Sequence, residues 1–162
     1  MYCSEAGRIG RTATVPADYG SIIRRRKMFN SHTFGVQIDR SVDDVYEFLL
    51  EPTNFGKWVF AGDAKMRHVG GRDWAVETSV GPRVIRFAER NSFGILDYFA
   101  LLTPESPPHP IPMRVVANGE GTELIYTSFQ RPGMSELEWK SVIEWVTVDL
   151  LALKSLLEAH QE

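Results

Sequence analysis

The segment "SELEWKSVIEWVTVDLLALKSLLEA", from Ser135 to Ala159, decides the fold. Its apolar residues recur every three or four positions, which predicts one amphipathic helix. At about 1.5 Å per residue this helix spans roughly 37 Å, more than an average helix of about three turns. Ser135 and Glu138 have the spacing of a capping box, so we expect the helix to begin at Ser135.

The apolar residues of this segment cover about half of the circumference of the predicted helix. The centre of this arc consists of Trp139, Ile143, Val146, Leu150, Leu153 and Leu157. Asp149 falls inside the arc, between Leu156 and Val142. An apolar arc of this width suits a helix laid against a sheet better than it suits a coiled coil.

Residues 32–60 are predicted to form one strand and two short helices. "HTFGVQIDR" (32–40) alternates apolar and polar residues, as a half-buried strand does. "SVDDVYEFLLEP" (41–52) has a helical apolar stripe, with Ser41 as its predicted N-cap and Pro52 as its stop. "TNFGKWVF" (53–60) predicts a second short helix or turn.

The middle of the chain predicts an antiparallel meander. Between Asp63 and Arg131, about six runs of strand length are separated by turn residues such as Gly70-Gly71. Five of the nine prolines lie in the segment 104–112, which we expect to form a loop and not a central strand.

Together these elements predict an α+β fold. A curved antiparallel sheet of about seven strands has one apolar face that needs a cover. The helix 135–159 is the predicted element that is large enough to cover it.

Charge is distributed unevenly along the 162 residues. The chain has a net charge of −3, but residues 1–30 carry six basic and two acidic side chains, so the remainder is about −7. We expect 1–30 to be a basic, disordered extension and 31–162 to be one domain. A globular part with this negative charge is a poor general binder of nucleic acid. The run Arg24–Lys27 is either a solvated tail or a site for an anion, a membrane surface or a nucleic acid.

The sequence also excludes several classes of protein and site. No apolar run is long enough for a membrane span, so we expect no integral membrane association. The single cysteine, Cys3, rules out an internal disulfide and a cysteine-based metal site, and a reducing, cytoplasmic setting is the simplest interpretation. No nucleotide-binding or hydrolase motif is present, so we expect no cofactor. The oligomeric state stays open.

The chain resembles the helix-grip superfamily that includes START domains, Bet v 1-like proteins and polyketide cyclases (the SRPBCC superfamily). The segments that carry this resemblance, over about residues 31–162, are "FGVQIDRSVDDVYEFLLEPTNFGKW", "GEGTELIYTSF" and "PGMSELEWKSVIEWVTVDLLALKSLLEA". The resemblance implies a hydrophobic cavity between the sheet and the long helix. It implies binding of a small hydrophobic molecule such as a lipid, a polyketide or an aromatic compound. The alternatives are a cyclase or dehydratase, and a protein-interaction module of the chaperone-regulator kind.

Three residues are candidates for catalysis. Asp149 is either a cavity carboxylate that moves protons or an ion-paired residue at the rim. Arg86 either points inward, where it needs a carboxylate partner such as Asp149, or faces solvent. Its neighbours Ile85 and Phe87 are better core residues, which favours solvent. His68 is a cavity candidate, but it has no second ligand at metal-binding spacing, so we expect no metal site.

Aromatic and apolar side chains are the candidates for ligand binding, since aromatic rings with polar tips orient flat apolar ligands. The predicted set is Trp74, Tyr98, Tyr126, Trp139, Val142, Trp145 and Val146. Packing in the core explains many of these residues equally well. His109, in the proline-rich segment, is either at the mouth of the cavity or simply exposed.

Overall fold

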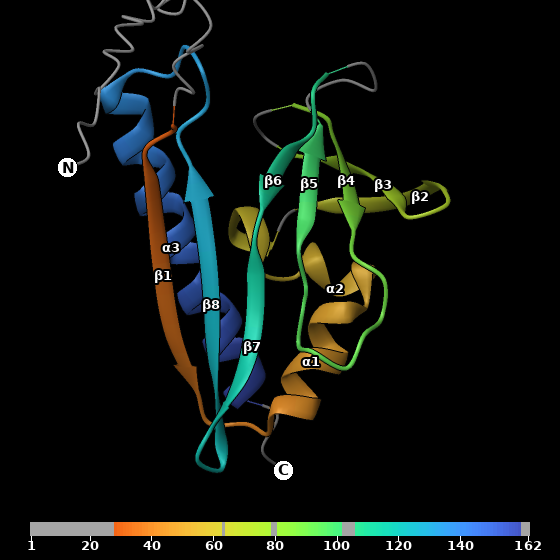
Figure 1. Ribbon diagram of the computed structural model, residues 1–162. Helices are drawn as coiled ribbons and strands as arrows, with labels where there is room; N and C mark the ends of the chain where they lie inside the picture. The colour runs from red at the N-terminus through yellow and green to blue at the C-terminus, as the bar shows by residue number, and fades with distance from the viewer. Residues whose placement is uncertain (1–27, 63, 79–80, 102–105, 160–162) are drawn as a thin grey trace, which may run out of the picture.

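The computed structural model describes residues 28–62, 64–78, 81–101 and 106–159. The predicted α+β class is confirmed (Figure 1). The helices are α1 (Val42–Leu50), α2 (Pro52–Phe55), a short 3-10 helix η2 (Val59–Gly62) and α3 (Glu136–Glu158). The strands are β1 (Ser31–Ile38), β2 (Lys65–Gly70), β3 (Asp73–Glu77), β4 (Arg83–Phe87), β5 (Tyr98–Leu101), β6 (His109–Ile111), β7 (Met113–Asn118) and β8 (Gly121–Phe129).

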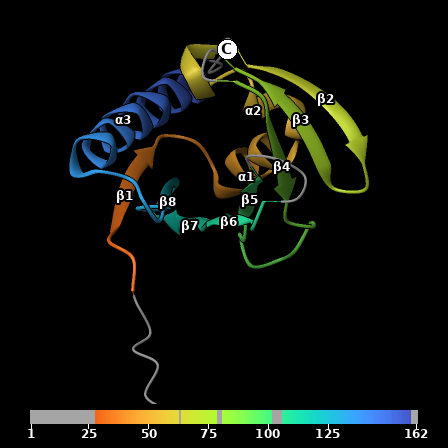
Figure 2. The ribbon, with the colours of Figure 1, turned by 90° about the horizontal axis from the view of Figure 1, so that it is seen from above.

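The strands of the described residues form two antiparallel sheets. One sheet has the order β1-β8-β7 and the other has the order β2-β3-β4-β5-β6. Seen from above, the strands of the two sheets follow one another along a curved path (Figure 2). Helix α3 covers the sheet β1-β8-β7 on the inner side of this curve. The predicted curved sheet with a long helical cover is therefore confirmed.

The two sheets meet where the chain passes from β6 into β7. Pro112 stands between them, and its carbonyl accepts a hydrogen bond from the backbone N–H of Thr127. Strand β7 is also bonded to the segment before β5, since the Gly94 carbonyl accepts a hydrogen bond from the N–H of Val115. Gly94 has a φ of 66°, and a Cβ there would lie 2.2 Å from the Val115 oxygen. Glycine is therefore needed for this close approach.

The prediction that residues 104–112 form a loop is wrong for residues 109–111. His109–Ile111 forms β6, which pairs with β5. This strand lies at the edge of its sheet. Proline lacks a backbone N–H, and an edge strand tolerates it because one side of the strand needs no donor. The prediction that the segment is not a central strand is right.

The two long helices begin where the sequence predicts. The hydroxyl of Ser41 accepts a hydrogen bond from the N–H of Asp44, which caps α1. In α3 the Ser135 hydroxyl accepts from the Glu138 N–H, and the Glu138 carboxylate accepts from the Ser135 N–H. This reciprocal pair is the predicted capping box.

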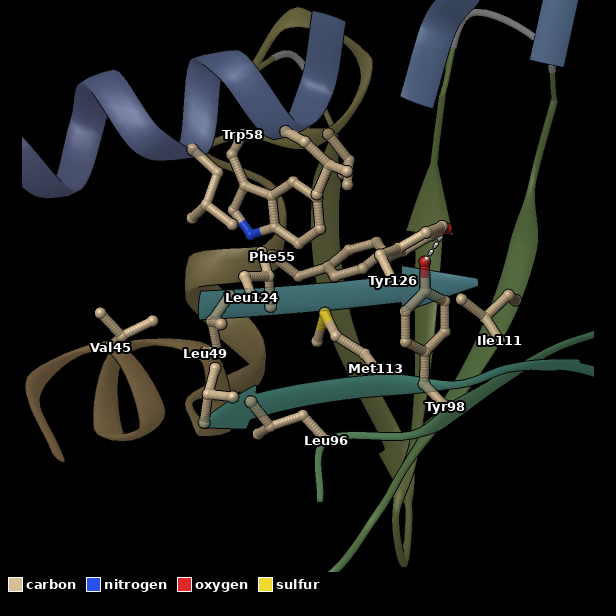
Figure 3. Packing of buried hydrophobic residues seen from close by; sticks show 14 of the residues in the cluster. Val45, Leu49, Phe55, Trp58, Leu96, Tyr98, Ile111, Met113, Leu124 and Tyr126 are labelled. Atoms are coloured by element: carbon tan, nitrogen blue, oxygen red, sulfur yellow. Dashed lines mark hydrogen bonds between the residues drawn. The ribbon is translucent and has the colours of Figure 1, made fainter. Parts of the chain in front are cut away.

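One continuous hydrophobic core joins the helices to both sheets. Figure 3 shows Phe55 and Trp58 between α3 and the strands, and their ring centroids lie 5.2 Å apart in an edge-to-face arrangement. Four α3 residues are buried: Trp139, Leu150, Leu153 and Leu157. All four belong to the predicted centre of the apolar arc. The helix is therefore fixed by the face that the sequence pattern selects.

The expected extension at 1–30 falls mainly outside the described residues, since these begin at Met28. The carbonyl of Asn30 accepts a hydrogen bond from the Gln130 N–H, and the Asn30 side-chain amide donates to the Gln130 side chain over 2.7 Å. The pairing of β1 with β8 thus continues by one residue pair, with Asn30 just before β1 and Gln130 just after β8. Within the described ranges, no helix has both the length and the apolar character needed to cross a membrane.

Candidate functional site

A cavity of about 900 Å³ lies between the five-stranded sheet, β8 and α3. Most of its wall is aromatic or aliphatic. The wall includes Phe55, Trp58, Val59, Val76, Ile85, Ala100, Ile111, Val142 and Val146. Small-molecule sites in proteins have volumes of roughly 300–1,000 Å³ and mainly apolar walls with a few polar groups. The cavity therefore has the size and the surface of a ligand site.

Side chains that line the cavity and are also half exposed to solvent mark its rim, on α3 and in the segment before β1. Trp145 on α3 lines the cavity, yet 56% of its surface is exposed. Phe29 also lines the cavity and is 49% exposed. The segment 106–110 and the turn 131–134 complete this rim. Large half-exposed aromatic rings at the rim give an apolar ligand a surface to contact as it enters.

The most buried polar group of the cavity is a pair of tyrosines. Tyr98 on β5 and Tyr126 on β8 are 5% and 6% exposed. Their hydroxyl oxygens are 2.9 Å apart and share a hydrogen bond, drawn as the dashed line in Figure 3. Burial raises the pKa of Tyr126 to about 12, and the nearby Asp149 carboxylate also raises it. The pKa of Tyr98 is raised well above its usual value, first by burial and then by Tyr126 and Asp149.

Asp149 lines the same cavity from the α3 side. Its side chain is partly buried, and its charge acts on both tyrosines. Two turns of α3 bring Val142, Trp145, Val146 and Asp149 to the cavity wall, because these positions share one side of the helix. The cavity thus holds a carboxylate and two phenols within electrostatic reach of one another.

A second polar group lies on the cavity wall near β6. His109 lines the cavity, and burial lowers its pKa. The charge of Arg131 lowers the pKa of His109 further, while a hydrogen bond with the Phe129 backbone offsets part of the shift. Arg83 and Glu138 also line the cavity. The cavity wall thus carries charged side chains as well as a histidine whose neutral form is favoured.

The structure places six of the ten residues predicted for catalysis or ligand binding on the cavity wall. The cavity is lined by Asp149, Tyr98, Tyr126, Val142, Trp145 and Val146. Four other candidates are not part of its lining: Arg86, His68, Trp74 and Trp139.

The four residues outside the cavity have structural surroundings of their own. Arg86 donates two hydrogen bonds to Asp73 on the neighbouring strand. His68 contacts the ring of Trp74, with centroids 5.2 Å apart, and its Nε2 lies 3.0 Å from the Gly71 carbonyl oxygen. Trp139 is buried in the first turn of α3.

The sequence analysis did not single out Arg83, Ser128, Arg131 or Glu138 as site residues. One signal was available for Arg83: strand alternation places it on the face of Ile85, whose side chain is buried. Ser128 lies two residues after Tyr126 on β8, on the same face, and is also buried. No local pattern indicates Arg131, because it lies in the irregular segment between β8 and α3.

No group of three or more His, Cys, Asp or Glu side chains within the described ranges is arranged to hold a metal ion. The polar side chains on the cavity wall, Tyr98, Tyr126, Asp149 and His109 among them, can form hydrogen bonds and transfer protons.

Solved structures of low sequence identity share this fold. A START superfamily protein from Mycobacterium smegmatis matches with a TM-score of 0.65 at 10% identity, over 80% of this chain and 97% of the other. The Aha1 dimer from Colwellia psychrerythraea matches with a TM-score of 0.64 at 15% identity, over 82% and 99% of the two chains. DynU16, a protein in the dynemicin biosynthetic locus, matches with a TM-score of 0.62 at 17% identity, over 79% of this chain and 47% of its own.

This chain has the helix-grip fold that these solved structures share. No protein-family model and no curated protein matches the sequence. At identities of 10–17% the likeness concerns the fold, and function has to be argued from the site itself.

Proposed function

We propose that this protein binds a small, mainly apolar molecule in the cavity between α3 and the sheets. The observation that supports this most strongly is the volume of about 900 Å³ combined with a largely aromatic and aliphatic wall. An interaction module of the chaperone-regulator kind needs no such cavity, so the volume favours a ligand-binding role. We propose a cytoplasmic location as well, because one cysteine in the chain suits a reducing compartment.

Binding of the neutral fluorophore N-phenyl-1-naphthylamine tests this proposal. Its emission increases in dry apolar surroundings, so titration with the full chain should give saturable enhancement. The variant Ala100→Trp/Val146→Trp places two indole rings in the cavity, one from β5 and one from α3. We expect it to bind the fluorophore at least about tenfold more weakly, since the two rings occupy apolar volume and cover apolar wall that the fluorophore would contact.

The matched control places tryptophan at two exposed positions, in Val69→Trp/Val148→Trp. Neither Val69 nor Val148 lines the cavity, so this variant should bind as the wild type does. Equal affinity in the wild type and in the cavity-filled variant, with both folded by circular dichroism, would overturn the proposal.

A second candidate function is an enzyme of the polyketide cyclase or dehydratase kind. The observation that favours it is the convergence of Asp149, Tyr98 and Tyr126 on one cavity. A carboxylate beside neutral phenols provides a proton acceptor and proton donors for general acid–base chemistry. The wild type and Asp149→Asn, each incubated with a metabolite extract of the host, should then differ in a consumed mass detected by mass spectrometry. Identical extracts after both incubations would speak against this candidate.

A further inference from the structure

The hydroxyl pair of Tyr98 and Tyr126 indicates which polar group a ligand of the cavity carries. This inference rests on the proposed ligand-binding function. Both residues line the cavity, and they come from different sheets. The Tyr98 ring lies edge-to-face against Phe55 at 5.3 Å, and the Tyr126 ring lies against Phe34 at 6.0 Å. Packing on both rings fixes where the two hydroxyl groups lie. A ligand therefore meets a polar group that is already in place.

The Tyr98–Tyr126 pair has one hydroxyl hydrogen that it can donate to a ligand. Each phenol has one hydroxyl hydrogen, and the 2.9 Å contact between the oxygens consumes one of the two. The tyrosine that accepts within the pair keeps its own O–H as a donor. The pair thus offers a hydrogen bond to an acceptor atom, and a carbonyl oxygen is an acceptor without a hydrogen of its own.

The electrostatic surroundings favour a neutral acceptor over an anionic one. Burial and the Asp149 carboxylate raise the pKa of both tyrosines, so the phenols keep their hydrogens at neutral pH. The same burial and the same negative charge oppose a carboxylate or phosphate placed beside the hydroxyl groups. The cavity wall also holds two cations, Arg83 and Arg131. Arg83 lies at the end of β4 that the strand register places nearest to His109, and the charge of Arg131 acts on His109.

We propose that the ligand is an apolar molecule with a neutral carbonyl group, whose oxygen accepts a hydrogen bond from the Tyr98–Tyr126 pair. The remainder of the molecule lies against the apolar wall formed by residues such as Ile85, Ile111 and Val146. Apolar ketones are the simplest members of this ligand class.

Fluorene and 9-fluorenone test the proposal, because they share one three-ring skeleton and differ in the carbonyl. Each is titrated against the full chain loaded with N-phenyl-1-naphthylamine, and its affinity is taken from displacement of the fluorophore. We expect the wild type to bind 9-fluorenone roughly 3- to 10-fold more tightly than fluorene, the factor that one net hydrogen bond provides.

The variant Tyr98→Phe/Tyr126→Phe removes both hydroxyl groups and keeps both rings. Because the two partners of a buried hydrogen bond are replaced together, the fold should be preserved. We expect this variant to bind the two compounds with equal affinity. The carbonyl stretching band of bound 9-fluorenone should lie at a lower frequency in the wild type than in the variant.

Tyr46→Phe is the control for loss of a tyrosine hydroxyl. Tyr46 is also a core residue, but its hydroxyl accepts a hydrogen bond from the Asn91 N–H outside the cavity. This variant should keep the preference for 9-fluorenone. If the wild type binds both compounds equally, or if the doubly substituted variant keeps both the preference and the band position, the carbonyl proposal is overturned while the ligand-binding proposal stands. If none of the three compounds binds the wild type, the ligand-binding proposal itself fails.

Discussion

Arg86 on β4 donates two hydrogen bonds to the carboxylate of Asp73, the residue opposite it on β3, over 2.7 Å and 2.8 Å. These hydrogen bonds and the charge of Arg86 hold the pKa of Asp73 below its usual range, against a smaller effect of burial. The arginine considered for cavity chemistry therefore acts as part of the sheet.

The Asp73–Arg86 ion pair makes stability depend on acid pH. A carboxylate whose pKa is lowered by folding contributes stability that is present above its unfolded pKa of about 3.9 and is lost as the pH falls through the lower folded value. We expect Arg86→Met to have a smaller free energy of unfolding than the wild type at pH 7, and this difference to shrink below about pH 4. The loss at pH 7 should be small because the pair is partly exposed. Urea denaturation at a series of pH values measures it.

Arg67→Met on β2 is the control, since Arg67 is an exposed arginine of the same sheet. Its effect on the free energy of unfolding should not change between pH 7 and pH 3. A constant difference between Arg86→Met and the wild type over this range would show that Asp73 does not carry the effect.

Two leucines of α3 should differ sharply in their contribution to stability. Leu153 is fully buried, with 0% exposure, whereas Leu151 is 54% exposed. Leu153→Ala leaves a cavity in the core, so we expect it to cost about 2–5 kcal/mol of unfolding free energy. Leu151→Ala should change this free energy by less than about 0.5 kcal/mol. Chemical denaturation of the two variants compares them directly, and similar losses would contradict the burial of this helix face.

The contribution of the capping box at the start of α3 to the free energy of unfolding should be measurable in the same way. Ser135→Ala removes the hydroxyl that accepts from the Glu138 N–H, and we expect a loss of about 1 kcal/mol. Ser155→Ala, at an exposed position near the end of α3, should be neutral or slightly stabilising because alanine is the better helix former. If the two variants have the same midpoint of thermal unfolding, the cap does not stabilise the helix.

The sequence predicted those parts of the fold that depend on local periodicity. The apolar arc of α3 was recognisable because Leu150, Leu153 and Leu157 recur at helical spacing, and all three are buried. Likewise, strand alternation placed Ile85 inward and so favoured an outward Arg86. In both cases the pattern indicates which apolar side chains are buried on folding. Burial of apolar surface is the main driving force of folding.

The sequence could not predict contacts between distant segments. The Tyr98–Tyr126 hydrogen bond joins residues from two sheets, and no local pattern fixes their register. The Asp73 carboxylate that pairs with Arg86 depends on the pairing of β3 with β4, which spacing alone leaves open. Arg131 reaches the cavity from an irregular segment, where side-chain direction has no period. Sites built from such contacts require the three-dimensional structure.

The proximity of Arg131 to His109 predicts a change in the titration of the histidine. Burial and the positive charge of Arg131 both lower the pKa of His109, so its neutral form extends to lower pH than in an ordinary histidine. Arg131→Met keeps the length of the side chain and removes the charge. We expect the pKa of His109 to rise in this variant while remaining below that of an exposed histidine, because the effect of burial persists. NMR titration of the imidazole signals measures both values, and Arg67→Met, remote from the cavity, should leave the His109 titration unchanged. An unaltered pKa of His109 in Arg131→Met would show that the arginine does not act on the histidine in solution.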